Sequence, residues 1–191
     1  MIDRISECVA AILTSIDGFE DNRSLIYQVG VDVLISTGLT VAGITGFSIV
    51  LCNRLGAIFF LLCFMTVRSY SGGYHAKTRT RCFLLTCGSY LLTVIPIRAK
   101  LFHYYSFCSF ATAGIVIVVW YLFVPVDNVN KRLPQDWKRT NRYRAWVSVG
   151  GWLMFSVVMR RWSEELSFQI IMTILVIALL ILRCRPWKEA L

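Results

Sequence analysis

The chain has 191 residues, of which 57% are hydrophobic and only 16% are charged, and its formal net charge is +9. Soluble domains are closer to half apolar and a quarter charged, so this composition excludes a soluble globular protein and indicates a polytopic membrane protein. We expect one domain over residues 1–191. The seven cysteines form no Cys-x-x-Cys pair, which leaves a zinc site or a thioredoxin-like centre without support, and we expect no metal or cofactor.

The first predicted element is an amphipathic helix within an N-terminal segment that covers residues 1–24. Aliphatic side chains recur at helical spacing over residues 2–16, and Asp3, Arg4 and Glu7 lie off that stripe. Such a helix lies on the membrane surface. The segment lacks the uninterrupted apolar core of a signal peptide, so we expect it to stay in the mature chain.

Six apolar runs follow, and they predict an all-α protein with about six transmembrane helices. The runs cover residues 29–51, 55–67, 82–97, 101–126, 145–159 and 166–182. A helix needs about 20 apolar residues to cross a bilayer core of roughly 30 Å. The run at 55–67 is short, because thirteen helical residues span only ~20 Å. It crosses if the helix continues into residues 68–71; otherwise it stops partway and is re-entrant.

The distribution of positive charge orients these spans. If six spans leave both termini in the cytoplasm, 15 of the 20 Lys and Arg residues lie on the cytoplasmic side and 5 lie outside. This bias supports a multi-pass protein of the cell membrane in that orientation. Residues 68–82 and 127–144 then share the cytoplasmic face with the two termini.

Between the second and third runs lie Arg68, Gly72-Gly73, His75 and Cys82. Cysteine attacks as the thiolate, and a nearby imidazole can take the thiol proton. Residues seven apart on one straight helix are ~10 Å apart, so His75 must leave the helix of Cys82, and the glycine pair lets the chain fold back. Arg68 can bind a carboxylate or an oxyanion. Taken singly, these residues are better explained as an apolar cysteine, an interfacial histidine and a turn. Their joint occurrence beside Arg68 puts the catalytic interpretation on a level with that explanation.

A second cluster of charge covers residues 127–144, which we predict to be a basic cytoplasmic loop. It holds six cations and two acids, a local net charge of +4. One interpretation is a stop-transfer loop that touches anionic lipid; the other is a docking site for an acidic peptide. Asp127 can orient His75. A nucleic-acid partner is not expected for a short loop against a bilayer. The candidate substrate-binding residues are Lys131, Arg132, Lys138, Arg139 and Arg142.

Both clusters resemble motifs of the accessory gene regulator B (AgrB) family of Gram-positive bacteria. The first has the pattern Arg68-x-x-x-Gly72-Gly73-Tyr74-His75-Ala76-x-Thr78-x-x-x-Cys82. The second has the pattern Pro125-Val126-Asp127-Asn128-x-Asn130-Lys131. The family often has a proline after the lysine, where this chain has Arg132.

The resemblance implies an integral membrane cysteine endopeptidase for quorum sensing. Cys82 matches the family's nucleophile and His75 its catalytic histidine, while Arg68, Gly72 and Gly73 match supporting positions. Such an enzyme cleaves the acidic C-terminal tail from a small AgrD-like precursor and keeps the core as an acyl thioester. A cysteine or serine of the peptide then closes a thiolactone or lactone ring, which yields the autoinducing peptide. The resemblance also implies a homodimer.

Two other classes of membrane protein compete with a peptidase. In a small transporter or exporter of a peptide, His75 and Cys82 would be structural, and the peptide would leave unshortened. A lipid-head-group transferase is disfavoured, because such enzymes need clustered carboxylates for metal, and the eleven acids of this chain form no such cluster.

Overall fold

The computed structural model describes residues 24–71, 79–124 and 135–183, and all of its regular elements there are helices. This confirms the predicted all-α class; the predicted amphipathic helix at residues 2–16 lies outside the described residues. The elements are α2 (Ser24–Val50), α3 (Arg54–Ser71), α4 (Arg79–Arg98), the 3-10 helix η2 (Leu101–Tyr104), α5 (Tyr105–Phe123), α6 (Gln135–Met159) and α7 (Glu164–Arg183).

Each of the six apolar runs overlaps one α-helix, and the run at 101–126 also includes the 3-10 helix η2. Within the described residues, four helical stretches are long and apolar enough to cross a membrane, at Val33–Val50, Arg54–Ser71, Thr80–Arg98 and Glu164–Arg183. A shorter apolar helical stretch covers Ser109–Phe123. The described helices are therefore those of a helical membrane protein.

The short second run belongs to a helix that continues past residue 67. Helix α3 has 18 residues, about 27 Å at the usual rise. Its polar last turn is held to the turn before it, since the hydroxyl of Ser69 donates to the carbonyl of Met65 at 2.6 Å. The guanidinium carbon of Arg68 lies 5.2 Å from the ring centroid of Phe64. Of the two predicted alternatives, the structure has the longer helix.

The prediction of a loop over residues 127–144 was wrong for its second half. Helix α6 begins at Gln135 and runs for 25 residues, ten residues earlier than the apolar run. Lysine, arginine and glutamine are good helix formers despite their charge. Hydropathy detects their polarity but not their helix propensity. The apolar run at 145–159 is therefore shorter than the helix. Residues 127–134 lie outside the described part.

The chain divides into two compact units, residues 1–43 and 44–191. The described part of the first unit is the beginning of α2, where the hydroxyl of Thr40 donates to the carbonyl of Ser36 at 2.9 Å. The last turns of α2 belong to the second unit, and Ile44 is buried in its core. All that follows concerns the second unit.

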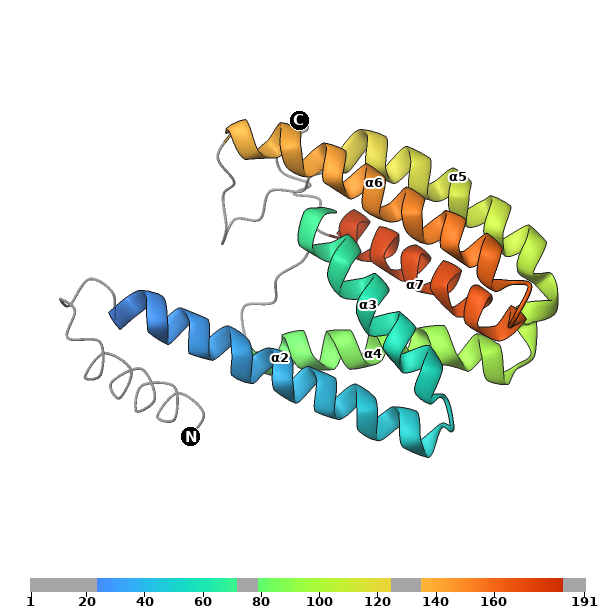
Figure 1. Cartoon of the computed structure of the whole chain (residues 1–191), viewed down its shortest axis with the longest axis horizontal. Coiled ribbons are helices and arrows are strands. Elements are labelled where there is room, and N and C mark those ends of the chain that lie inside the picture. Colours follow the sequence, from blue (N-terminus) through green and yellow to red (C-terminus); the bar gives the residue numbers. More distant parts are fainter. Residues whose placement is uncertain (1–23, 72–78, 125–134, 184–191) are drawn as a thin grey trace. The chain divides into compact units, whose positions relative to one another are not determined.

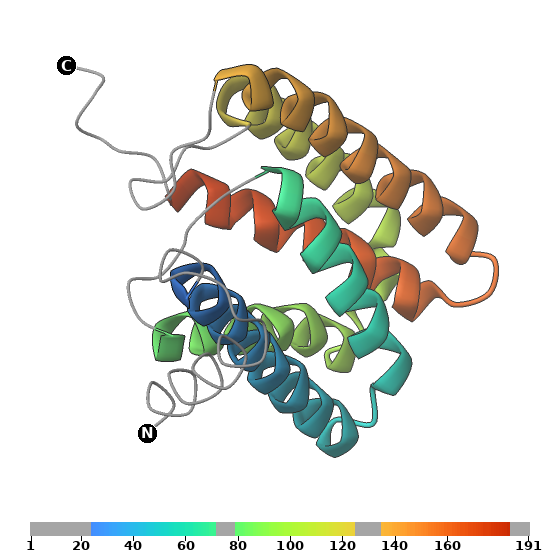
Figure 2. The same ribbon diagram turned by 60° about the vertical axis from the view of Figure 1, so that its left-hand side comes forward.

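Helix α7 is the centre of the second unit. It contacts α3, α4, α5 and α6, and both ribbon views show it among them (Figures 1 and 2). Its buried side chains include the polar Ser167, Gln169 and Thr173 besides aliphatic residues. The hydroxyl of Ser167 donates to the carbonyl of Ser156 on α6 at 2.6 Å, and that of Thr173 donates to the carbonyl of Gln169, one turn earlier on α7, at 2.7 Å. A helix surrounded in this way depends on close packing with its neighbours.

The turn between α2 and α3 fixes where α3 starts. The amide of Asn53 donates to the carbonyl of Ser48 at 2.9 Å, and that of Cys52 to Ile49 at 3.1 Å. These two bonds form a Schellman motif. Cys52 takes the left-handed position with φ 47°, where glycine is the usual residue.

Helix α3 approaches α7 closely at Gly56. The side-chain amide of Asn53 donates to the Gln169 side chain of α7 at 3.0 Å. A Cβ atom at Gly56 would collide with the oxygens of both side chains. Because Gly56 has no side chain, the hydrogen-bonded side chains of Asn53 and Gln169 fit against the backbone at this position.

Candidate functional site

One end of the second unit contains those predicted site residues that the structure describes. Here α3 ends, α4 and α6 begin, and α5 and α7 end; in Figure 1 these helix ends lie toward the left. We call this the motif end, and the opposite end, with the α2–α3 turn, the distal end. The described residues at the motif end include Arg68, Cys82, Arg139 and Arg142.

Cys82 lies in the first turn of α4, which begins at Arg79. The helix thus begins three residues before the apolar run at residues 82–97. The thiol is free and half-buried. The N-terminus of a helix carries partial positive charge, which favours an anion such as a thiolate.

The other described thiols have different surroundings. Cys63 and Cys87 are buried, and Cys52 is exposed at the distal end. Among the cysteine side chains that the structure describes, only that of Cys82 is both partly exposed to solvent and located at the motif end. The geometry thus separates the predicted nucleophile from cysteines that only fill the core.

Several predicted site residues lie outside the described part of the chain. Gly72, Gly73 and His75 belong to the segment between α3 and α4, while Asp127, Lys131 and Arg132 belong to the segment between α5 and α6. The side chain of Lys138 is also not described. The structure fixes the helix ends on either side of His75, and the distance from its imidazole to Cys82 stays a prediction.

Arg68 is held at the end of α3 by its contact with an aromatic ring. Its guanidinium carbon is 5.2 Å from the ring centroid of Phe64, a cation–π distance. Phe64 in turn stacks on Phe60 with ring centroids 5.2 Å apart. The half-buried Arg68 thus has its stem fixed on α3 and its charge at the motif end.

The basic residues at the start of α6 have two different environments. Arg139 and Arg144 are exposed. Arg142 donates a hydrogen bond to the carbonyl of Tyr121 at 3.1 Å, and its guanidinium carbon lies 5.8 Å from the centroid of that ring. Because Tyr121 is in the last turn of α5, Arg142 satisfies one of the carbonyls that a helix end leaves free. Arg142 therefore joins α5 to α6, a role that the sequence did not predict.

Sequence reasoning also missed a groove between α3 and α6. Its volume is about 840 Å³. The indole nitrogen of Trp152 on α6 donates to the hydroxyl of Thr66 on α3 at 2.8 Å. The sequence contains a signal, since the glycine pair 150–151 stands before Trp152 in an apolar run. The lining residues are Thr66, Tyr70, Tyr143, Arg144, Val147, Ser148, Gly151, Trp152 and Phe155.

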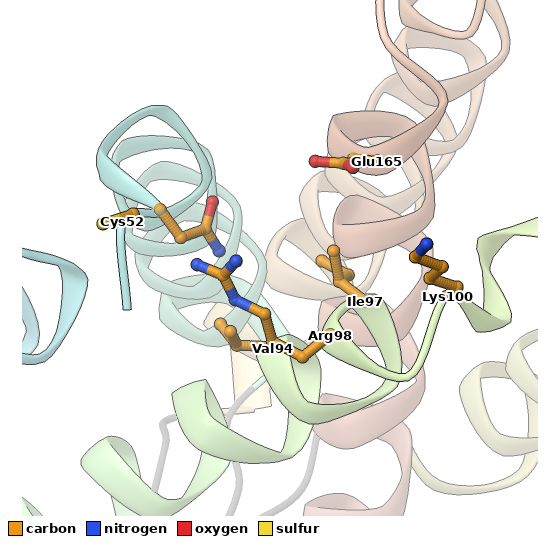
Figure 3. A pocket seen from close by; sticks show the side chains of 7 residues that line it. Cys52, Val94, Ile97, Arg98, Lys100 and Glu165 are labelled. Atoms are coloured by element: carbon orange, nitrogen blue, oxygen red, sulfur yellow. The ribbon is translucent and has the colours of Figure 1, made fainter. Parts of the chain in front are cut away.

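A smaller pocket of about 180 Å³ lies at the distal end. Figure 3 shows Arg98 and Lys100 on the side of α4 and Glu165 on α7, with Cys52 nearby. This pocket opens at the other end of the helices from Cys82, so it is separate from the predicted site. Among the helices that the structure describes, no three His, Cys, Asp or Glu side chains gather as metal ligands would.

The sequence matches the model of a known family, described as accessory gene regulator B, over residues 5–184. It is also 29% identical over 144 residues to AgrB-like protein 2 of Clostridium perfringens (strain 13 / Type A), covering 73% of this chain and 67% of that protein. An AgrB-like protein of Clostridium perfringens (strain SM101 / Type A) is 26% identical over 144 residues, with the same coverage of both chains. No solved structure matches the chain.

Proposed function

This chain belongs to the accessory gene regulator B family, whose members take part in processing quorum-sensing peptides, and we propose that it is a membrane cysteine endopeptidase for such a precursor. The observation that carries the proposal is the position of Cys82. Its free, half-buried thiol stands in the first turn of α4, directly after the segment that contains His75. Cys82 is the proposed nucleophile and His75 the proposed general base.

The proposed reaction is an acyl transfer in two steps. The Cys82 sulfur attacks the scissile carbonyl while His75 takes the thiol proton. When the peptide bond breaks, His75 returns that proton to the leaving amine of the tail, and the core stays on Cys82 as a thioester. A cysteine or serine of the core then attacks the thioester carbonyl, closes the ring and releases the Cys82 thiol. A site at the membrane boundary favours this outcome because it limits hydrolysis by water.

Arg68 is proposed to stabilise the anionic oxygen that forms during attack. Its guanidinium is positioned by Phe64 at 5.2 Å, which lowers the entropy lost on binding an anion. Gly72 and Gly73 are proposed to let the chain turn between α3 and α4, so that His75 reaches Cys82. Asp127 is proposed to orient the imidazole.

The proposed substrate is an AgrD-like precursor with an acidic C-terminal tail. The exposed Arg139 at the start of α6 offers a positive charge to that tail, together with Lys131, Arg132 and Lys138. The proposed orientation has this face and both termini in the cytoplasm, because most cations lie on that side. A homodimer in the bilayer is the proposed assembly.

The test is cleavage of a synthetic precursor by purified protein in liposomes. We expect Cys82→Ala and His75→Ala to lose cleavage, because they remove the nucleophile and the base. The matched control is Cys52→Gly, which removes an exposed thiol at the distal end and should cleave at the wild-type rate. Full cleavage by Cys82→Ala would refute the peptidase proposal, and transport of the unshortened peptide by the wild type would support an exporter instead.

A further inference from the structure

We propose that the groove between α3 and α6 binds one anionic phospholipid. In this arrangement, the phosphate lies at Arg144 and an acyl chain lies along Val147, Trp152 and Phe155. The proposal concerns a surface that the peptidase reaction does not use, so it is independent of the proposed function.

The lining of the groove changes from polar to apolar along α6. Tyr70, Tyr143 and Arg144 lie toward the motif end, and Val147 and Phe155 lie farther along the helix. Tyrosine is typical of the headgroup level of a membrane, and aliphatic and phenyl side chains are typical of the hydrocarbon level. An occupant must therefore have a polar head at one end and be apolar over the rest, as a phospholipid is.

The groove favours an alkyl chain over a non-helical peptide. The lining follows α6 from Tyr143 to Phe155, about 18 Å at 1.5 Å per residue. This length fits within a bilayer core of roughly 30 Å. A non-helical peptide would leave backbone groups without hydrogen bonds inside a bilayer.

The charge at the groove selects an anionic head. Arg144 is exposed, and none of the residues that line this part of the described structure is acidic. Basic pockets between transmembrane helices on the cytoplasmic side attract anionic lipid headgroups.

The floor of the groove is built by packed side chains. Trp152 donates to the hydroxyl of Thr66 at 2.8 Å, and its ring meets Phe155 edge-on with centroids 5.5 Å apart. Phe155 also contacts Phe59 of α3, with ring centroids 5.7 Å apart. Above this floor, a Cβ atom at Gly151 would meet nothing within 4 Å. A larger side chain at Gly151 would therefore enter the groove without disturbing α3.

The experiment is native mass spectrometry of the full-length protein, released from liposomes of phosphatidylglycerol and phosphatidylcholine. The wild type should retain one phosphatidylglycerol in preference to phosphatidylcholine. Gly151→Leu should abolish this preference by filling the groove, and Arg144→Gln should weaken retention about fivefold, the effect of roughly one basic residue at an anionic surface. The matched controls are Gly114→Leu on α5, whose Cβ also meets nothing within 4 Å, and Arg139→Gln; both should retain the lipid.

A second measurement does not require a substitution that fills the groove. Phosphatidylglycerol with brominated acyl chains should quench the fluorescence of the wild type more than that of Trp152→Phe, because a bound chain touches this indole. Equal quenching, equal retention by Gly151→Leu, or equal retention of phosphatidylcholine would each overturn the proposal. A change of Gly151→Leu from dimer to monomer without loss of lipid would also overturn it and assign the groove to a second copy.

Discussion

Replacing Gly56 with alanine tests the close approach of α3 to α7. The new methyl group would collide with the side-chain oxygens of Asn53 and Gln169. Gln169 is buried, with only 1% of its surface exposed, and it accepts a hydrogen bond from Asn53 at 3.0 Å. To relieve the collision, the ends of the two side chains must move, which strains or breaks this bond.

The size of the effect follows from two opposing contributions. Overpacking of a core or loss of a buried hydrogen bond costs about 1–3 kcal/mol each. Alanine in place of glycine inside a helix raises the stability of that helix by about 1 kcal/mol. The net loss should be about 1 kcal/mol, which lowers the Tm of a protein of this size by about 2–4 °C.

A thermal scan with a thiol-reactive dye in detergent measures this loss. Cys63 and Cys87 are buried, so they react only when the helices come apart. The control is Gly114→Ala, where a Cβ atom meets nothing within 4 Å and no loss is expected. Adding Gln169→Ala to Gly56→Ala should recover part of the Tm, because it removes one colliding side chain. If Gly56→Ala melts no earlier than Gly114→Ala, the described contact between α3 and α7 is wrong.

Three further outcomes are expected. Cys52→Gly should raise the Tm, because φ 47° suits glycine and costs another residue about 1 kcal/mol; an unchanged or lower Tm would contradict the turn geometry. A membrane-impermeant maleimide should label Cys52 in right-side-out vesicles and Cys82 in inverted ones, and labelling of both from one side would refute the topology. Arg142→Gln should lower the Tm by removing the bond to Tyr121, while Arg139→Gln should leave it unchanged but raise the KM for the precursor; the reverse pattern would contradict both roles.

The positions of the helices were predictable because the signal is local. A helix that crosses a bilayer needs a run of apolar residues of known length, and each of the six runs marked one helix. The boundaries were less predictable where polar residues continue a helix. Ser69 bonds to the turn before it, and Arg142 bonds to α5, so both helices extend into segments that hydropathy counts as loops.

The contacts between helices could not be predicted from one sequence. Asn53 and Gln169 are 116 residues apart in the chain, and Trp152 and Thr66 are 86 residues apart. Only the packing of α3 against α6 and α7 brings these pairs together. By contrast, the place of Cys82 at the start of a helix was predictable, because the polar residues before it end the preceding apolar run. Its pairing with His75 rests on the sequence motif.

The most direct test of a peptidase built on Cys82 is to look for the covalent intermediate. Wild-type protein mixed with precursor is quenched in acid within seconds, digested and analysed by mass spectrometry. We predict that the precursor core, without its tail, is attached to the fragment that contains Cys82 and is released by hydroxylamine, as a thioester would be. Release of the tail with no adduct on Cys82, or with the adduct on another cysteine, would contradict the account.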